Sequence, residues 1–450
     1  MNRKALIGLI TYGLVAILLA ACTTPVTTTA SVATTAPVAT AEPTEAPPED
    51  DGGLTSDPVT LTFWWEGAAV GNLEVFQKSF DRFTELHPNV TIETVAIPFE
   101  DMLRTLPLAL DAGTGPDISM SLPLESTTYP AAQAGHLLEL TEIGEERGWW
   151  DHFDMKAIDF NNRALDGIYG VPYEWTAVGV FYNTEIFAEH GLEPPATLAE
   201  FEALMQTLVE AGVTPVSVGG KDGWPLVHVF QALVFTNAEY ETLRGLEDRD
   251  TSYTYEDPSI IEAAHKTLDW FNAGYLDANL LSTGFTDAND LFINGQTAMN
   301  IGGTWVQQDF RNAPFEVRFF QVPPMRTDIP LHLGGFNPAN DIVIVKDGPN
   351  EAWAIELLDF LVSEENMTLW WENGFLVPYV FGDLPQGKDQ LQADLYGTML
   401  ENGPGHFITV SMPETNQLIW ANFQEIIAET KTPEEAFAEI QEQFLTEAGQ

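Results

Sequence analysis

The chain has 450 residues, 45% of them hydrophobic and 12 of them tryptophan, so it buries a large core. A body of this length exceeds one ordinary core, and we expect two lobes. Its 67 acidic residues against 18 basic ones give a formal net charge of −49. Such a surface repels phosphate backbones and anionic headgroups, which excludes nucleic-acid binding but names no ligand.

The first residues form an export signal. Arg3 and Lys4 give a short basic start, and an apolar run over residues 5–21 ends in small residues. This run is near the lower limit for crossing a bilayer, so an uncleaved anchor is the alternative. The tetrapeptide LAAC that ends at Cys22 resembles the lipobox of bacterial lipoproteins, whose cysteine is diacylated after cleavage. Cys22 is the only cysteine and forms no internal disulfide, so we expect a signal peptide over 1–21 and a lipid on Cys22.

Residues 22–57 differ in composition from everything that follows. They are rich in Thr, Ala, Pro and then acidic residues, with no aromatic residue and no apolar periodicity. Such a segment buries too little surface to fold, and its prolines keep it extended. We expect a disordered tether that holds residues 58–450 away from a membrane.

The folded body begins with a strand, a helix and a strand. Alternate residues are apolar over 59–65, which predicts a strand. Apolar residues then recur every three or four positions from Leu73 to Phe83, which predicts an amphipathic helix. The segment VTIETVAI, residues 90–97, predicts a second strand. This order and spacing are typical of a parallel crossover unit, so we expect an α/β fold.

Further elements follow along the chain. Thr197 and Thr432 each precede a glutamate by three residues, and these capping boxes predict helices that start there. Residues 169–183, 297–305 and 332–345 are β-rich and interrupted by Gly or Pro. No internal repeat is present.

Taken in order, these segments resemble the family 1 extracellular solute-binding proteins, the maltose-binding-protein-like proteins that serve ABC importers. The resemblance covers nearly all of residues 58–444 and rests on the order of the motifs, since each one alone is weak. The motifs are LTFWW, HPNVTIETV, LDAGTGPDISMS, GIYGVPYEWTAVGVFYN, EPPATLAEFEALMQTL, LFINGQTAMNIGGTW, HLGGFNPANDIVIVKD and TPEEAFAEIQEQF.

The resemblance implies a two-lobed periplasmic-binding-protein-like fold with hinge crossings and a central ligand cleft. The N-terminal lobe comprises residues 58–170 and 336–385. The C-terminal lobe comprises residues 171–335 and 386–450. Hinge closure over the ligand is likewise implied by the resemblance to the family.

Two short peptides carry the chemistry of a sugar site. A pyranose has an apolar C–H face and a ring of hydroxyls, so aromatic plates must combine with carboxylates and amides. WWEG and PYEWT each place tryptophan beside glutamate near a predicted strand end. The aromatic residues do not by themselves exclude a cation, which also stacks on aromatic faces.

Carried onto this chain, the family resemblance implies a set of ligand-binding residues spread over six segments. Trp305, the aromatic residue after the AMNIGG strand, is the principal candidate. At Gly335 the missing side chain lets a ligand approach backbone N–H groups. The whole set is Trp65, Glu66, Ser121, Glu125, Tyr173, Glu174, Trp175, Trp224, Trp305, Gly335 and Phe336.

Several of these assignments have structural alternatives. Trp65 is equally consistent with a core residue, and Asp117 of the Gly-Pro-Asp motif is expected to be a structural cap. Around Ser121 and Glu125 the familiar family member has an aromatic, an acidic and a basic residue, so this chain departs from it and maltose is not simply carried over. Five other tryptophans lie on helical patterns and are expected to pack in the core or on the surface: Trp270, Trp353, Trp370, Trp371 and Trp420.

Catalytic and metal motifs are missing from the sequence. It has no Gly-x-Ser-x-Gly elbow, no His-Glu-x-x-His and no phosphate loop, and its eight histidines lack ligand spacing. Glu66 and Glu174 imitate a glycosidase pair, but such a coincidence is expected in so acidic a chain. We therefore expect no enzymatic activity, no cofactor and no metal.

The sequence thus predicts an exported lipoprotein, anchored to the outer face of the cytoplasmic membrane through Cys22. It captures a carbohydrate and delivers it to the transmembrane subunits of an ABC permease, as a monomer in keeping with its family. Three alternatives stay open: a cationic ligand such as a polyamine, a sensor subunit that feeds a receptor, and an exported glycosidase.

Overall fold

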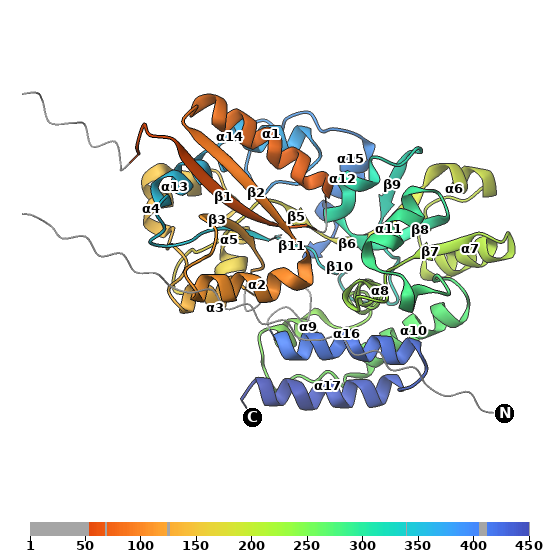
Figure 1. Ribbon diagram of the computed structural model, residues 1–450. Helices are drawn as coiled ribbons and strands as arrows, with labels where there is room; N and C mark the ends of the chain where they lie inside the picture. Colours follow the sequence, from red (N-terminus) through yellow and green to blue (C-terminus); the bar gives the residue numbers. More distant parts are fainter. Residues whose placement is uncertain (1–53, 68–69, 124–126, 339, 405–411, 450) are drawn as a thin grey trace, which may run out of the picture. The chain divides into compact units, whose positions relative to one another are not determined.

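The computed structural model describes residues 54–67, 70–123, 127–338, 340–404 and 412–449 (Figure 1). The predicted signal peptide, Cys22 and most of the tether lie outside these residues, as does Glu125. Within them, no helix has both the length and the apolar character needed to cross a membrane. The body from Asp51 onward is one unit and contains two separate larger sheets.

The first sheet has five strands in the order β2-β1-β3-β12-β4. β1 runs parallel to β2 and β3, and β12 runs antiparallel to β3 and β4. The strands are β1 (Val59–Glu66), β2 (Val90–Ile97), β3 (Ile118–Ser121), β4 (Val171–Pro172) and β12 (Asp341–Ile344).

The predicted crossover unit is confirmed. β1 pairs in parallel with β2, and the helix α1 (Val70–Leu86) connects them. Leu61 and Phe63 are fully buried on one face of β1, and Phe63 contacts Phe76 and Phe80 of α1. The alternation in the strand and the stripe on the helix therefore meet in one core, as their periods require.

The second sheet has four strands in the order β7-β8-β6-β9. β7 is parallel to β8, whereas β6 is antiparallel to both β8 and β9. The strands are β6 (Val178–Asn183), β7 (Thr214–Ser217), β8 (Thr297–Gly303) and β9 (Val317–Phe320). A second core cluster surrounds this sheet, with Val180, Val216 and Ile301 at most 1% exposed.

The chain passes between the two sheets more than once. It leaves β4 of the first sheet and enters β6 of the second within a few residues, through the short strand β5 (Trp175–Thr176). It returns through β11 (Asn337–Pro338), which pairs antiparallel with β5 before the chain enters β12. A further short pair joins β10 (His332–Leu333) to β13 (Gly403–Pro404). These paired crossings connect the two sheets.

Helices flank both sheets. Those in the segments that carry the first sheet are α1, α2 (Phe99–Asp111), α3 (Thr128–Gln133), α4 (Thr141–Arg147), η1 (Trp149–Asp151), α5 (Met155–Asn162), α13 (Glu351–Leu361) and α14 (Glu364–Glu372). The others are α6 (Thr184–His190), α7 (Leu198–Glu210), α8 (Trp224–Val234), α9 (Tyr240–Glu247), α10 (Pro258–Asn272), η2 (Leu280–Ser282), α11 (Phe285–Ile293), η3 (Thr304–Val306), α12 (Gln307–Phe310), α15 (Gln390–Glu401), α16 (Pro413–Ile427) and α17 (Pro433–Glu447).

Both predicted capping boxes are confirmed. The Thr197 hydroxyl accepts from the Glu200 backbone N–H at 3.2 Å, and the Glu200 carboxylate accepts from the Thr197 backbone N–H at 3.1 Å. Thr432 does the same for α17. α17 lies beside α16 at the C-terminal end of the chain (Figure 1), and Phe423 and Phe437 join the two helices through ring contact. The lobe boundaries at residues 170, 335 and 385 remain a prediction.

Candidate ligand-binding site

Five ring side chains from four separate elements form a cluster that we call the aromatic group. Trp224 lies at its centre, with ring centroids 4.5 Å from Phe285 and 5.5 Å from Phe99. His228 bridges Trp224 and Trp305, with centroid distances of 5.3 and 5.2 Å. Phe99 lies at the start of α2, directly after strand β2 of the first sheet. The other four residues lie in helices that come after strands β7 and β8 of the second sheet. The cluster is thus assembled from residues attached to both sheets.

Local sequence explains the position of Trp305. Its side chain folds back over the end of β8, so that a Cβ on Gly303 would lie 2.0 Å from the indole ring. Only glycine leaves that space, which gives a physical role to the GGTW sequence. Trp224 is the first residue of α8, and His228 lies one turn later on the same face.

His228 is neutral at physiological pH. It is 4% exposed, and burial lowers the pKa of its imidazole to about 3. A neutral imidazole both donates and accepts, so it suits a hydroxyl ligand better than an imidazolium would. The sequence analysis missed this residue because a histidine on an apolar helix face gives no signal of its own.

A second cluster, the buried polar group, consists of Asn72, Tyr173, Glu174 and Gln307. Each of these four residues is at most 3% exposed. The Glu174 carboxyl lies next to Tyr173 and Gln307, and the Asn72 amide lies next to Tyr173. No hydrogen bond of normal geometry is made by either oxygen of Glu174, by either polar atom of the Asn72 amide, or by Nε2 of Gln307. These side chains nevertheless lie close enough to one another for Tyr173 and Gln307 to lower the pKa of Glu174, so the group is held together by contacts among its own members.

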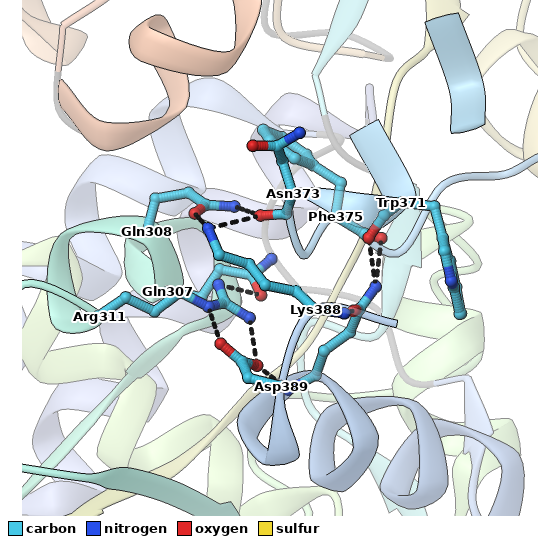
Figure 2. Close-up of polar contacts among 9 residues, drawn as sticks. Gln307, Gln308, Arg311, Trp371, Asn373, Phe375, Lys388 and Asp389 are labelled. Carbon is cyan, nitrogen blue, oxygen red and sulfur yellow. Dashed lines mark hydrogen bonds and ion pairs between the residues drawn. The ribbon is translucent and has the colours of Figure 1, made fainter. Parts of the chain in front are cut away.

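Burial sets the protonation of this group. It raises the pKa of Glu174 to about 8, although Tyr173, Arg311 and Gln307 act in the opposite direction. Burial and the nearby Glu174 and Glu66 carboxylates hold the pKa of Tyr173 well above its usual range. Arg311 does not contact Glu174 directly, because Asp389 engages its Nε and Nη2 at 2.7 and 3.0 Å (Figure 2).

The two clusters are adjacent along the chain. Trp305 and Gln307 are separated by one residue where η3 passes into α12, and Glu174 immediately precedes Trp175. Trp175 is half-buried and contacts Phe336 edge-on at 5.4 Å, within the β5–β11 crossing. Gly335, with a φ of 64°, lies in the turn before Phe336. The structure therefore brings Glu174, Trp175, Trp305, Gln307 and the crossing loop to one region.

The residues predicted on β1 lie in different surroundings. Trp65 is 2% exposed in the core cluster of the first sheet, as the core alternative requires, and its Nε1 has no hydrogen-bond partner. Glu66 ends the strand and is partly exposed, and its charge acts on Tyr173. Ligand contact by these two residues remains a prediction.

Ser121 belongs to a buried hydroxyl network. Its Oγ lies 2.8 Å from the Thr127 hydroxyl and accepts a hydrogen bond from Thr128 at 2.9 Å. Thr128 also donates to Asp341 at 3.2 Å, and burial raises the pKa of Asp341 to about 7. All of these bonds are internal to the protein, so ligand contact by Ser121 remains a prediction.

Asp117 has the structural role expected of it. Its carboxylate accepts from the backbone N–H and the hydroxyl of Thr62 at 2.7 and 2.8 Å. Asn350 donates to its other oxygen at 3.0 Å. The aspartate thus ties β1 to the start of α13. The helical Trp270, Trp353, Trp370 and Trp371 are buried, and Trp420 is half-buried, as predicted.

Five further residues complete the two clusters, and the sequence analysis did not identify them as ligand contacts: Asn72, Phe99, His228, Phe285 and Gln307. They lie in the first residues of helices or inside them, where their types are common for structural reasons. In the part of the chain that the structure describes, no three His, Cys, Asp or Glu side chains are arranged to hold a metal ion.

Two α/β units joined by paired crossings, with aromatic and polar side chains gathered beside the crossings, define the two-lobed class of periplasmic binding proteins. Residues 70–368 match the model of the bacterial extracellular solute-binding protein family. The chain belongs to that family, which implies export from the cytoplasm.

Individual relatives are distant. An uncharacterized ABC transporter extracellular-binding protein of Pyrococcus horikoshii is 27% identical over 54% of this chain and 55% of its own length. The chain thus spans about half the length of that relative. The alpha-glucosides-binding periplasmic protein AglE of Rhizobium meliloti is 24% identical over 66% of this chain and 70% of its own length.

Structural likeness extends further than sequence likeness. A solved chitin oligosaccharide binding protein superposes with a TM-score of 0.74 at 22% identity, covering 88% of this chain and all (100%) of that chain. At this identity the likeness establishes the shared fold.

Proposed function

We propose that this protein captures a carbohydrate outside the cytoplasm and delivers it to the membrane subunits of an ABC importer. The observation that carries the proposal is the aromatic group, whose rings come from segments of both sheets, with buried polar side chains close to it along the chain. A pyranose supplies what both clusters need, an apolar face for the rings and hydroxyls for the polar atoms. Family relatives named for alpha-glucosides and chitin oligosaccharide are consistent with this ligand class.

The proposed mechanism is binding without covalent chemistry. The rings of the aromatic group cover the sugar face, the polar residues bind its hydroxyls, and closure of the two lobes about the β5–β11 crossing presents a surface to the permease. The protein acts as a monomer without cofactor or metal. The N-terminal lobe comprises 58–170 with 336–385, and the C-terminal lobe comprises 171–335 with 386–450.

Export and anchoring form the second part of the proposal. Residues 1–21 direct export and are removed, Cys22 carries the lipid, and residues 22–57 tether the body to the outer face of the cytoplasmic membrane. Replacing the cysteine (Cys22→Ser) should abolish incorporation of a labelled fatty acid in a bacterial host. Labelling that persists in this variant would contradict the assignment.

The test of ligand class uses thermal unfolding of the body from Pro58 onward. The panel contains D-galactose, maltotriose, raffinose, xylotriose and N,N′-diacetylchitobiose, with spermidine and a peptide mixture as controls. A ligand at about 100 times its Kd adds roughly 2.7 kcal/mol to the free energy of unfolding, which a melting curve resolves. A midpoint raised by a sugar alone supports the proposal. A shift with spermidine alone points to a cationic ligand, and sugar hydrolysis on long incubation points to a glycosidase.

A further inference from the structure

An ion pair joins the two α/β units. Arg163 follows α5, which packs against β4 of the first sheet and against β11 of the crossing. Glu247 ends α9, whose Leu243 and Leu246 are buried in the core cluster of the second sheet. Nη2 of Arg163 donates a hydrogen bond to Oε1 of Glu247 at 2.7 Å. The pair therefore connects a helix of one unit to a helix of the other.

The Arg163 guanidinium is oriented by its own helix. Its Nη1 donates to the Phe160 carbonyl oxygen at 3.0 Å, and its Cζ lies 4.3 Å from the centre of the Phe160 ring. Its Nε lies 3.9 Å from the Asp248 carboxylate, beside Glu247. Because the planar fork is held before it meets Glu247, little side-chain entropy is lost when the pair forms.

Burial keeps the pair strong and keeps it away from a ligand. The side chain of Glu247 is 2% exposed and that of Arg163 is 20% exposed, so salt screens their attraction less than it would on the surface. A ligand has almost no Glu247 surface to contact. Any effect of this pair on binding must therefore act through the arrangement of the two units.

That arrangement also assembles the aromatic group. Phe99 belongs to the first unit, and its ring centroid lies 5.5 Å from that of Trp224 in the second unit. In a separate place, the Gly71 N–H of α1 donates to Asp309 of α12 at 2.8 Å. A ligand that contacts both Phe99 and Trp224 requires the units to be held in this way. A contact that stabilises the arrangement thus increases the fraction of molecules that are able to bind.

We propose that the Arg163–Glu247 pair is a latch: it stabilises the arrangement in which Phe99 meets Trp224 and so raises ligand affinity without touching the ligand. This inference rests on the proposed function and concerns the regulation of that same site. Apparent affinity is the intrinsic affinity multiplied by the fraction of molecules in the binding-competent arrangement. Breaking a buried ion pair by removing one member is strongly destabilising, so the loss of either residue lowers that fraction. Arg163 and Glu247 are positioning residues.

Distances between two spin labels test the latch without any ligand. The body from Pro58 onward contains no cysteine, so labels on E85C in α1 and E189C in α6, both exposed positions, mark one site in each unit. We expect R163M and E247Q each to move part of the population away from the wild-type distance. The double variant should move no more than the larger single effect, because both changes break one pair. A wild-type distance distribution in R163M and in E247Q would overturn the latch.

Calorimetry measures the consequence for binding. The tightest binder among D-galactose, maltotriose, raffinose, xylotriose and N,N′-diacetylchitobiose is titrated into the wild-type protein, R163M and E247Q. We expect each variant to weaken binding about tenfold, the loss for one hydrogen bond between charged groups. If R163M fails to fold, E247Q decides in its place, since it keeps the size and shape of the side chain. Wild-type affinity in E247Q would overturn the latch. Failure of all five sugars to bind would overturn the proposed function, and the label distances would still decide the latch.

The matched control is R147M. Arg147 ends α4 and pairs with Glu356 at 3.1 Å and Asp359 at 3.4 Å, both in α13 of the same unit. Its loss should lower the free energy of unfolding, as loss of Arg163 does, but should leave the label distances and the sugar affinity unchanged. Equal losses of affinity in R147M and R163M would reduce the Arg163–Glu247 pair to a general contribution to stability and overturn the latch.

Discussion

The aromatic group and the buried polar group differ in how exposed their side chains are and in how well their contacts are satisfied. In the aromatic group, Trp224 and Trp305 are partly exposed and every ring has another ring beside it. In the buried polar group the side chains are nearly inaccessible, yet five of their polar atoms have no partner. The first cluster is stable as it stands, because ring contacts satisfy it. The side chains of the second cluster lie beside one another, but these five atoms make no hydrogen bond of normal geometry.

This difference suggests a division of labour. Aromatic surface binds any sugar face without distinguishing its substituents, so under the proposed function we expect the first cluster to supply most of the affinity. Hydrogen-bonding atoms in a buried site discriminate strongly, because a wrong ligand leaves them unpaired. We therefore expect specificity to depend on the second cluster, and the following experiments test the two clusters and one helix outside them.

The largest effect is expected from Trp305→Ala. Loss of the indole removes apolar contact worth roughly 2–3 kcal/mol, so sugar affinity should fall about 30- to 150-fold, as measured by calorimetry. Trp150→Ala is the control, since Trp150 is also partly buried but contacts Trp149 and Phe153 away from the site. Equal affinities in both variants would remove Trp305 from the site.

The next effect concerns the contact that joins α1 to α12. The Gly71 N–H donates to Asp309 at 2.8 Å, and a Cβ at Gly71 would lie 2.5 Å from Cβ of Gln308. Gly71→Ala should therefore lower the free energy of unfolding by about 2 kcal/mol in a denaturant titration, because backbone would have to move. The substitution should also weaken sugar binding, because Asn72 comes directly after Gly71 and Gln307 comes directly before Gln308.

Gly397→Ala is the matched control for that experiment. Gly397 lies inside α15 with open space around its missing side chain. The substitution should leave affinity unchanged and raise stability by roughly 0.5–1 kcal/mol, since alanine favours the helix. A destabilisation equal to that of Gly71→Ala would show that crowding at Gly71 has no role.

Protonation gives a third test. The pKa of Glu174 is about 8 in the folded chain against 4.5 ordinarily, so the folded state holds a proton that the unfolded state has lost. The free energy of unfolding must then fall as pH rises from about 4.5 to about 8, by up to about 1.4 kcal/mol per pH unit. His228, with a folded pKa of about 3 against 6.5, acts in the opposite sense, and its stabilisation is lost as pH falls below 6.5.

Glu174 can be separated from the other buried groups by choosing the range. From about pH 8 to about pH 9, His228 and Asp341, whose pKa is about 7, contribute little, because both are largely deprotonated in the folded and the unfolded state. E174Q should flatten the wild-type decline in unfolding free energy over this range. An unchanged slope in E174Q would mean that the carboxyl is not the group that titrates.

The smallest effect lies outside both clusters. Thr432→Ala removes the capping box of α17 and should cost about 1 kcal/mol of unfolding free energy. Sugar affinity should not change, because the helix supports only the C-terminal core. A change in affinity would show that α17 acts on the site.

Local patterns in the sequence determined much of the framework. The alternation over 59–65, the helical stripe after it and the strand at 90–97 led to the parallel crossover that the structure contains. Both capping boxes begin helices where their spacing places them. These features depend on neighbours within one or two turns of chain, so sequence alone is sufficient to find them.

The site itself depends on distant parts of the chain. Sequence patterns drew attention to Trp224, Trp305 and Glu174, but not to His228, Asn72 or Gln307. Residues such as Asn72 and Gln307 belong to the candidate site because contacts join α1, α12 and the segment before β5, which are far apart in the chain. A buried asparagine or glutamine has no distinctive local pattern, and only the tertiary structure decides whether its hydrogen bonds are made within the protein or left for a ligand.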